Sequence, residues 1–290
     1  MSTSSDGGNT WSVPVSPAGN PKGLGGQPVV QPDGTVIVPF ESLKGKIGAF
    51  RSTDGGATWS KEFSVSKIRF HPNSGGLRTS PLPSAEIDAD GNVYVAWEDC
   101  RFEPKCTAND IVFSTSGDGV NWSAVQRIPI DTVGSGVDHF IPGLAVDPAT
   151  PATPASGAHL ALTYYFYPNG ACTVATCRLD VGFVSSPNGG ATWSASTPLA
   201  GPMSLTDIAA TSQGPMVGDY ISTSFNGTGT AATVFPIGKP HAGSVFDEGM
   251  WAPTTPLPVA SAAQATRHAS SAGTARGRGV GAAHHAIRRR

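Results

Sequence analysis

The sequence has few charged residues, few cysteines and no long apolar segment. Only 14% of its 290 residues are Asp, Glu, Lys or Arg, and it contains four cysteines. No apolar run approaches the roughly 18–20 residues that a membrane-spanning helix needs, so we expect no membrane span. The sequence also contains no glycine-rich phosphate loop, zinc-protease helix or serine-hydrolase elbow. We therefore expect neither a cofactor nor a metal.

The charge that is present is unevenly distributed. Residues 1–252 carry 13 basic and 21 acidic side chains, a net charge of −8, whereas residues 253–290 carry six arginines and no acid. An acidic body disfavours nucleic acid as a partner. The tail 253–290 has few large apolar residues and cannot bury enough surface to fold. We expect a folded domain at 1–252 and a disordered or artefactual tail, with an anchor to an anionic surface as the alternative for the tail.

Glycine and proline are abundant, and one short motif recurs. The 36 glycines and 25 prolines favour many short strands joined by tight turns. The pattern Ser-x-Asp/Asn-x-Gly-x-Thr-Trp occurs at 4–12, 52–60 and 185–194, and a degenerate copy occupies 114–123. Four copies that each end on tryptophan indicate a tandem repeat.

The chemistry of the motif is structural. Asp and Asn accept hydrogen bonds from backbone amides two or three residues further on, and the glycines supply the positive φ of a tight turn. The tryptophan ring then fills a gap between neighbouring strands or sheets. We assign this structural role, rather than a catalytic one, to Asp6, Trp11, Asp54, Trp59, Asp118, Trp122, Asn188 and Trp193.

Each motif is embedded in a longer repeating unit. Strand–turn–strand patterns precede the motifs at 28–40, 84–99 and 144–167, and further strands flank each motif. One period therefore holds four antiparallel strands, with the motif at the turn between the third and fourth. Four-stranded sheets repeated in tandem predict an all-β fold of the β-propeller type.

These residues resemble a known repeat. The motif is similar to the Asp-box, or bacterial neuraminidase repeat, of sialidases and related propellers. The segments VYVAWEDCR (93–101), DHFIPGLAVD (138–147) and MVGDYISTSF (216–225) resemble a bacterial, largely secreted branch of sialidase-like proteins. The resemblance covers roughly residues 1–250. It implies a sialidase-like β-propeller, glycans or glycoconjugates as partners, and an extracellular location.

The repeat predicts an incomplete ring. Full blades are expected at about 27–68, 82–130 and 140–200, with one partial blade before them and one after. Because sialidase-like propellers resemble six-bladed rings, we expect this chain to be truncated and any glycoside hydrolase activity to be impaired. The polar residues after Met1 do not form a signal peptide, so a leader would lie outside this chain.

The cysteines form two close pairs, Cys100 with Cys106 and Cys172 with Cys177. Neither pair has the CxxC spacing of zinc ribbons or thioredoxin-like motifs. Two local disulfides, which imply an oxidising compartment, are the main interpretation. Free thiols and a four-cysteine metal site remain the alternatives.

Candidate functional residues come from the loops that face the channel of a propeller. The resemblance implies three arginines that bind a substrate carboxylate, a Tyr nucleophile paired with a Glu, and an Asp acid/base. Arg78 and Arg101 are candidates for the arginines, and Tyr220 with Glu86 for the nucleophile pair, although no motif links the last two. The acid/base Asp is expected in an early blade that the chain does not include.

Two acidic positions complete the candidate catalytic set. Asp99 lies in Glu98-Asp99-x-Arg101 at a strand end, where it is either a channel group oriented by Arg101 or half of a structural ion pair. Asp219 either faces the channel or caps a strand. Because this set is incomplete, a non-catalytic extracellular propeller that binds carbohydrate or protein on its loop face is the alternative function.

Overall fold

The computed structural model describes residues 1–150, 157–227, 229–261 and 264–265. These residues form antiparallel sheets and no α-helix. Their only helical turns are the 3₁₀ segments η1 (Ser74–Gly76), η2 (Pro104–Cys106) and η3 (Leu205–Asp207). None of the described segments is a helix long and apolar enough to cross a membrane.

Three sheets have the strand order expected for complete blades. The first contains β1 (Gly23–Leu24), β2 (Val29–Val30), β3 (Val36–Ser42), β4 (Lys46–Ser52) and β5 (Phe63–Lys67). The second contains β6 (Ser84–Ile87), β7 (Val93–Asp99), β8 (Asp110–Ser116) and β9 (Gln126–Arg127). The third contains β10 (Asp138–Val146), β11 (Leu160–Tyr167), β12 (Arg178–Ser186) and β13 (Thr197–Ser204). Each strand pairs with the next in the chain, except that β1 and β2 both pair with β3.

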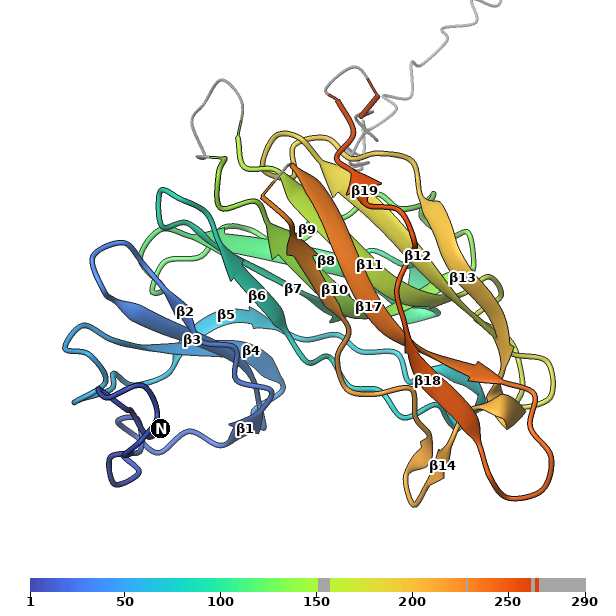
Figure 1. Cartoon of the computed structure of the whole chain (residues 1–290), viewed down its shortest axis with the longest axis horizontal. Coiled ribbons are helices and arrows are strands. Elements are labelled where there is room, and N and C mark those ends of the chain that lie inside the picture. Colours follow the sequence, from blue (N-terminus) through green and yellow to red (C-terminus); the bar gives the residue numbers. More distant parts are fainter. Residues whose placement is uncertain (151–156, 228, 262–263, 266–290) are drawn as a thin grey trace, which may run out of the picture.

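A fourth sheet follows at the C-terminal end of the described chain. It contains β16 (Ser222–Phe225), β17 (Thr230–Lys239), β18 (Asp247–Trp251) and β19 (Leu257–Pro258). A small hairpin of β14 (Ala210–Thr211) and β15 (Gly214–Pro215) lies in the connection before it. The sheets succeed one another in chain order, from the blue sheet at one end to the orange sheet at the other (Figure 1). The all-β prediction of tandem four-stranded antiparallel blades is confirmed.

The cores lie between consecutive sheets. Val29 and Ile37 of the first sheet share one buried cluster with Val95 and Trp97 of the second. Phe113 of the second sheet packs with the third sheet's residues, and the third packs in turn against Phe235 of the fourth. Strand β7 is buried along its whole length because sheets cover both of its faces, which explains the continuous apolar run Val93–Trp97 in its sequence. Each sheet therefore depends on its neighbours for burial.

In the turns that carry the motif, side-chain oxygens accept the hydrogen bonds of backbone amides and so close the turn. The Asp54 Oδ1 accepts a 2.9 Å hydrogen bond from the Thr58 amide, and Oδ2 accepts a 2.5 Å bond from the Thr58 hydroxyl. The Ser52 hydroxyl donates to Asp54 and accepts from the Gly56 amide. Asp6 makes the same pair of bonds to Thr10. These hydrogen bonds, first of all the one from the Thr58 hydroxyl, lower the pKa of Asp54 to about 2.

The degenerate copy reaches the same geometry with one residue fewer. Asp118 Oδ1 accepts the Asn121 amide at 2.8 Å, three residues on instead of four, and Oδ2 accepts the Asn121 side-chain amide at 2.7 Å. In the last copy Asn188 replaces aspartate, and its Oδ1 accepts the Thr192 amide at 2.8 Å. The turn thus needs an acceptor in this position more than it needs a charge.

The tryptophans of the motif differ in burial. Trp193 is 1% exposed, donates a 3.0 Å bond to the Gly190 carbonyl and packs edge-on against Phe113 of the preceding sheet. Trp59 is also buried, against Phe50. Trp11 differs from the expectation, because 65% of its surface is exposed. Residues 1–22, which carry this copy of the motif, contain no strand.

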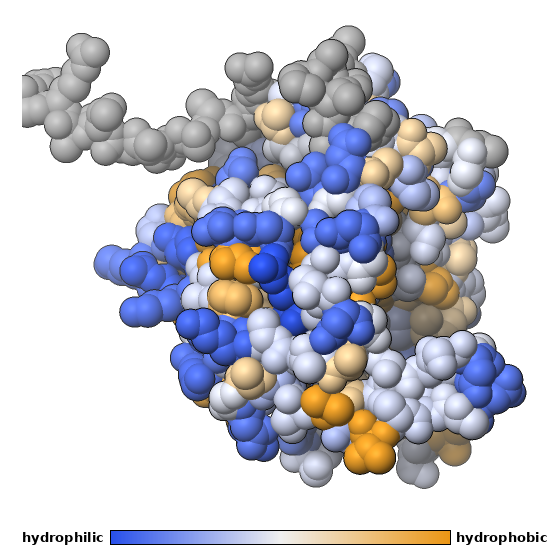
Figure 2. Space-filling view, turned by 90° about the vertical axis from the view of Figure 1, so that its left-hand side faces the viewer, coloured by the Kyte–Doolittle hydropathy of each residue, from blue (hydrophilic) through white to orange (hydrophobic). Residues whose placement is uncertain are grey.

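The same end of the molecule exposes other apolar side chains. Figure 2 shows this face, where orange hydrophobic groups lie among blue hydrophilic ones. The N-terminal segment and first sheet leave Val13, Leu24, Val30 and Leu43 exposed. By contrast, the inward side chains of the first sheet are covered by the second. The other side of the first sheet buries a smaller cluster of its own, which consists of Val38, Phe40, Phe50 and Trp59.

The end of the folded domain lies later than residue 252. Strand β19 pairs with β17 through Leu257 and Pro258, and Leu257 is buried. The boundary predicted after residue 252 is therefore placed too early, since the tail was expected to begin at 253. Residues 262–263 and 266–290, on which the rest of the disordered-tail prediction falls, lie outside the described residues.

The contrast between two tryptophans predicts different stability effects. We expect Trp193→Ala to lower the free energy of unfolding by about 3–5 kcal/mol, because it leaves a cavity between two sheets. Trp11→Ala should change it by no more than about 0.5 kcal/mol, as is usual at an exposed position. Urea unfolding followed by tryptophan fluorescence or circular dichroism measures both. Equal losses would contradict the role assigned to Trp193.

The lowered pKa of Asp54 predicts an acid dependence of stability. The ionised carboxylate is favoured in the folded state, so its contribution is present above the unfolded pKa of about 3.9 and is lost as the pH falls towards about 2. The stability difference between the parent and Asp54→Asn should shrink across this window. Asn188→Asp should gain the same dependence. Urea midpoints measured from pH 2 to 7 test both, and a flat difference would exclude the carboxylate as the cause.

Candidate functional site

The loops between second and third strands and the connections between sheets meet at one end of the sheets. The Arg78 amide donates to the Pro215 carbonyl at 2.8 Å, which joins the connection after β5 to the connection after β13. The Ser74 hydroxyl donates to the Gly170 carbonyl at 2.5 Å and joins the first connection to the β11–β12 loop. All three 3₁₀ turns lie in these segments. We call this end the loop face.

The loop face is stiffened by both cysteine pairs. Cys100 and Cys106 form a disulfide in the β7–β8 loop, with their Cα atoms 4.8 Å apart. Cys172 and Cys177 form one in the β11–β12 loop, with a Cα–Cα distance of 4.9 Å. The predicted pairing is confirmed, and free thiols and a four-cysteine metal site are excluded. A clipped loop loses less entropy when it binds a ligand.

Asp99 and Arg101 form a buried ion pair at the end of β7. Arg101 donates from Nε to Asp99 Oδ1 at 2.8 Å and from a terminal nitrogen to Oδ2 at 2.7 Å. Asp99 is fully buried and also accepts bonds from the backbone amides of Arg101 and Arg69 and from the Trp97 indole. Arg101 further donates to the Lys67 carbonyl. Asp99 and Arg101 therefore form the structural ion pair that was one of the two predicted alternatives, because no polar atom of Asp99 is left to bind a substrate.

Arg78, Asp219 and Tyr220 lie together on the loop face. Arg78 pairs with Asp219 at 3.3 Å, and the two side chains are 32% and 39% exposed. Arg78 also donates to the Met216 sulfur. Tyr220 is half-exposed, and burial first, then the charges of Asp219 and Glu41, raise its pKa. A raised pKa is the opposite of what an activated phenol nucleophile requires.

Glu86 does not assist Tyr220. Burial alone raises the pKa of Glu86 to about 7. No hydrogen bond joins Glu86 to Tyr220 in the part of the chain that the structure describes. The acids that act on Tyr220 are Asp219 and Glu41, and not the predicted partner Glu86.

Sequence reasoning missed a buried acid network behind this surface. Asp138, the first residue of β10, accepts the backbone amide of Asn109 at 2.7 Å and the side-chain amide of Asn73 at 2.8 Å. Burial nevertheless raises its pKa to about 6. Asp138 belongs to a segment that the family resemblance had marked, but Asn73 and Asn109 lie in loops whose sequence carries no signal.

Glu98 is a second buried acid beside this network. It is fully buried, and burial first, then the charge of Asp138, raises its pKa well above the usual range. Among the described residues Glu98 Oε1 has no hydrogen-bond partner, and Oε2 accepts only a 3.4 Å bond from the Ile141 amide. Ile141 has a φ of 49° at a bulge in β10. A β-branched residue adopts this conformation only where the surrounding structure enforces it.

An open hollow of 320 Å³ lies on the loop face in front of Asn73. Its walls combine an aromatic ring, a cation and neutral hydrogen-bonding groups, contributed by Phe70, Asn73, Leu77, Arg78, Thr79 and Gln213. The Thr79 hydroxyl donates to Asn73, whose amide holds Asp138. The hollow therefore offers a surface for a polar ligand with an anionic group, and the buried Asp138 acts on it only through Asn73.

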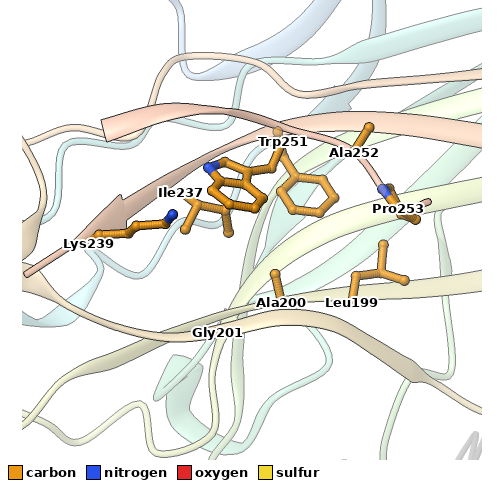
Figure 3. Close-up of a pocket in the computed structure, with 9 residues that line it drawn as sticks. Leu199, Ala200, Gly201, Ile237, Lys239, Trp251, Ala252 and Pro253 are labelled. Carbon is orange, nitrogen blue, oxygen red and sulfur yellow. The ribbon is translucent and has the colours of Figure 1, made fainter. Parts of the chain in front are cut away.

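A second hollow of 230 Å³ lies between β13 and β17–β18 (Figure 3). It is mainly apolar, with Leu199, Ile237 and Trp251 in its walls. The Lys239 ammonium lies 4.0 Å from the centre of the Trp251 ring. None of the predicted catalytic residues lines this hollow.

The tyrosines of β11 do not contribute to either hollow. Tyr164, Tyr165 and Tyr167 are fully buried. The Tyr165 hydroxyl donates to the Pro236 carbonyl at 2.7 Å, and that of Tyr164 lies 2.6 Å from the Ser196 hydroxyl. Their rings pack between sheets and are not free to stack on sugar rings.

Comparisons with known proteins concern the fold. No protein-family model matches the chain. No curated protein matches it either. Among solved structures, the intramolecular trans-sialidase of Ruminococcus gnavus is similar with 16% identity and a TM-score of 0.43, over 81% of this chain and 45% of that one. The NanB sialidase of Streptococcus pneumoniae has 17% identity and a TM-score of 0.43, over 81% of this chain and 32% of that one.

A third similar structure is an α-L-arabinanase of Penicillium chrysogenum complexed with arabinobiose. It has 17% identity and a TM-score of 0.47, over 80% of this chain and 65% of that one. The chain spans less than half the length of the sialidases that it matches. Similarity at this level assigns no activity, substrate or site residue to the chain.

The two arginine–aspartate pairs predict stability losses of different size. We expect Arg101→Ala to lower the free energy of unfolding by about 3–5 kcal/mol, because it leaves the Asp99 charge buried without its partner. Arg78→Ala, which breaks a partly exposed pair, should cost at most about 1 kcal/mol. Urea unfolding at neutral pH gives both values. A small loss for Arg101→Ala would reopen a functional role for Asp99.

Proposed function

We propose that this chain is a secreted, sialidase-like glycoside hydrolase propeller that acts on glycans at its loop face, and that its catalysis is impaired. The observation that carries the proposal is the position of Arg78 in the wall of the loop-face hollow, beside Phe70 and the neutral polar groups Thr79 and Gln213. Aromatic rings with convergent polar groups suit a sugar, and a guanidinium suits a sugar carboxylate. The substrate class is thus an anionic sugar at the end of a glycan.

The pairing of Arg78 with Asp219 fits such a role. The pair is partly exposed, so water screens it and a ligand carboxylate can replace Asp219 at modest cost. A bidentate carboxylate–guanidinium contact is stronger than this 3.3 Å contact. Asp219 then keeps Arg78 in position until the ligand arrives.

The contacts of the other candidate residues support impaired catalysis. Arg101 is committed to Asp99, and Arg127 is 10% exposed and held among acids, so neither supplies a second guanidinium to the hollow. Tyr220 has a raised pKa. These features favour slow but measurable turnover.

The same features support a second candidate, a non-catalytic extracellular propeller that binds carbohydrate through the same hollow. Both carboxylate oxygens of Asp99 accept hydrogen bonds from protein groups, so this acid beside Arg101 has a structural role. This favours the non-catalytic candidate. The two disulfides support an oxidising, extracellular compartment under either candidate.

Binding and turnover measured together separate the candidates. We expect the chain to bind sialyllactose more tightly than lactose, and Arg78→Ala to weaken sialyllactose binding by about 10–100-fold, as the loss of a charged hydrogen bond implies. Calorimetric titration gives the affinities, and a fluorogenic sialoside gives the turnover. Arg178→Ala, which removes an exposed arginine that does not line the hollow, is the matched control.

Each outcome has a clear meaning. Turnover that Arg78→Ala abolishes supports the glycoside hydrolase. Sialyllactose binding without turnover supports the non-catalytic propeller. Equal affinity for sialyllactose and lactose, or an unchanged affinity in Arg78→Ala, excludes Arg78 as the carboxylate-binding group.

A further inference from the structure

A second polar cluster lies between the second and third sheets, apart from the loop-face hollow. Asp110 begins β8, Arg127 ends β9, Asp131 follows in the connection, and His139 is the second residue of β10. Glu103, in the loop clipped by the first disulfide, accepts the Gly134 amide at 2.9 Å and so joins this cluster to the same connection. The cluster thus spans the boundary between two sheets.

One guanidinium faces three acids in this cluster. Arg127 lies 2.7 Å from Asp110 Oδ1, is hydrogen-bonded to Asp131 Oδ1, and lies 4.0 Å from Glu103 Oε1. With all three acids ionised and His139 neutral, the cluster carries a net charge of −2. Burial of uncompensated charge is unfavourable, so the group either takes up protons or binds a cation.

An imidazole lies among these carboxylates. A ligand atom of His139 lies within 4.8 Å of carboxylate oxygens of Asp110 and Asp131. A neutral imidazole beside carboxylates is the form in which histidine binds metals.

Two of the polar atoms are buried without a partner. Asp110 Oδ2 and His139 Nδ1 make no hydrogen bond in the described structure, and their residues are 2% and 1% exposed. One ligand atom each from Asp110, Asp131 and His139 lies within 4.8 Å of the others. Ligand atoms at about 2.1 Å from a tetrahedrally coordinated ion lie about 3.4 Å apart, so binding an ion would draw the most distant of these atoms together by up to about 1.4 Å.

We propose that Asp110, Asp131 and His139 form a binding site for one divalent transition-metal ion, with Zn²⁺ as the reference ion. One nitrogen and carboxylate oxygens suit a borderline cation better than Ca²⁺ or Mg²⁺, which prefer oxygen ligands alone. A divalent charge balances the net −2 of the cluster. Arg127 bonds Asp110 through Oδ1 and leaves Oδ2 free for the ion.

The site has a structural role and an access route. Its ligands come from the second sheet, the third sheet and the connection between them, so a bound ion ties the two sheets together. The Asp131 side chain is 19% exposed and provides the entry. Because none of these residues lines the loop-face hollow, this proposal is independent of the proposed function.

Metal binding by the oxidised full chain tests the proposal. His268, His284 and His285 are first replaced with Gln, so that the histidines of the C-terminal segment do not bind Zn²⁺. After chelator treatment and dialysis, Zn²⁺ is titrated by calorimetry and its stoichiometry is measured by elemental analysis. We expect one Zn²⁺ per chain and a higher thermal midpoint with the ion.

Variants of the ligands decide whether the ion binds at this cluster. His139→Gln and Asp131→Asn should each weaken Zn²⁺ binding by more than about 100-fold, since loss of an outer partner of a metal ligand alone costs about 10–100-fold. His159→Gln, a partly exposed histidine near Asp147, is the matched control and should bind as the parent does. Asp131→Asn is on a partly exposed residue and keeps the test valid if His139→Gln fails to fold. Absence of Zn²⁺ binding, or unchanged binding in the folded variants, overturns the proposal.

Discussion

The closure of the hairpin turns by side-chain acceptors is the constraint on which the rest of the structure depends. A turn between the third and fourth strands of a sheet exposes several amides, and in each copy of the motif one Asp or Asn side chain accepts them. The closed turn fixes the position of the tryptophan that follows. In the copy at 185–194, Trp193 then packs on Phe113 of the neighbouring sheet. A local hydrogen-bond pattern thus determines how two sheets meet. At Trp11 the turn also forms, although the ring is largely exposed to solvent.

The fold could be predicted from the sequence because its information is local and repeated. The strand–turn–strand patterns and the motif lie within a few residues, and each disulfide closes a loop of five or six positions. Even the degenerate copy, with Asp118 one position later, keeps its donors and acceptors within three residues. The late end of the domain was missed because β19 is a two-residue strand whose pairing with β17 has no local pattern.

The candidate site was harder to predict because it depends on contacts between distant segments. Arg78 and Asp219 were both named from the sequence, but only the fold shows that they pair across 141 positions. Asp99 and Arg101 were also named, yet their burial and the extra bonds from Arg69 and Trp97 make them structural. Asn73 and Asn109 had no sequence signal, since a loop asparagine becomes informative only when the carboxylate that it holds is known.

The polar groups buried between the second and third sheets lower the stability of the fold. Glu98, Asp110, Asp138 and His139 are desolvated at an interface that apolar side chains fill elsewhere, and such groups are costly unless fully partnered. Asp138 is compensated by three amide hydrogen bonds, while Glu98 and Asp110 keep an unpartnered oxygen. Hydrophobic contact alone lets two sheets slide, whereas a polar contact is satisfied in a single register. The cost of these buried acids is therefore consistent with their fixing the position of β10 against β7 and β8, and with it the connections that carry Asn73 and Arg78 to the loop face.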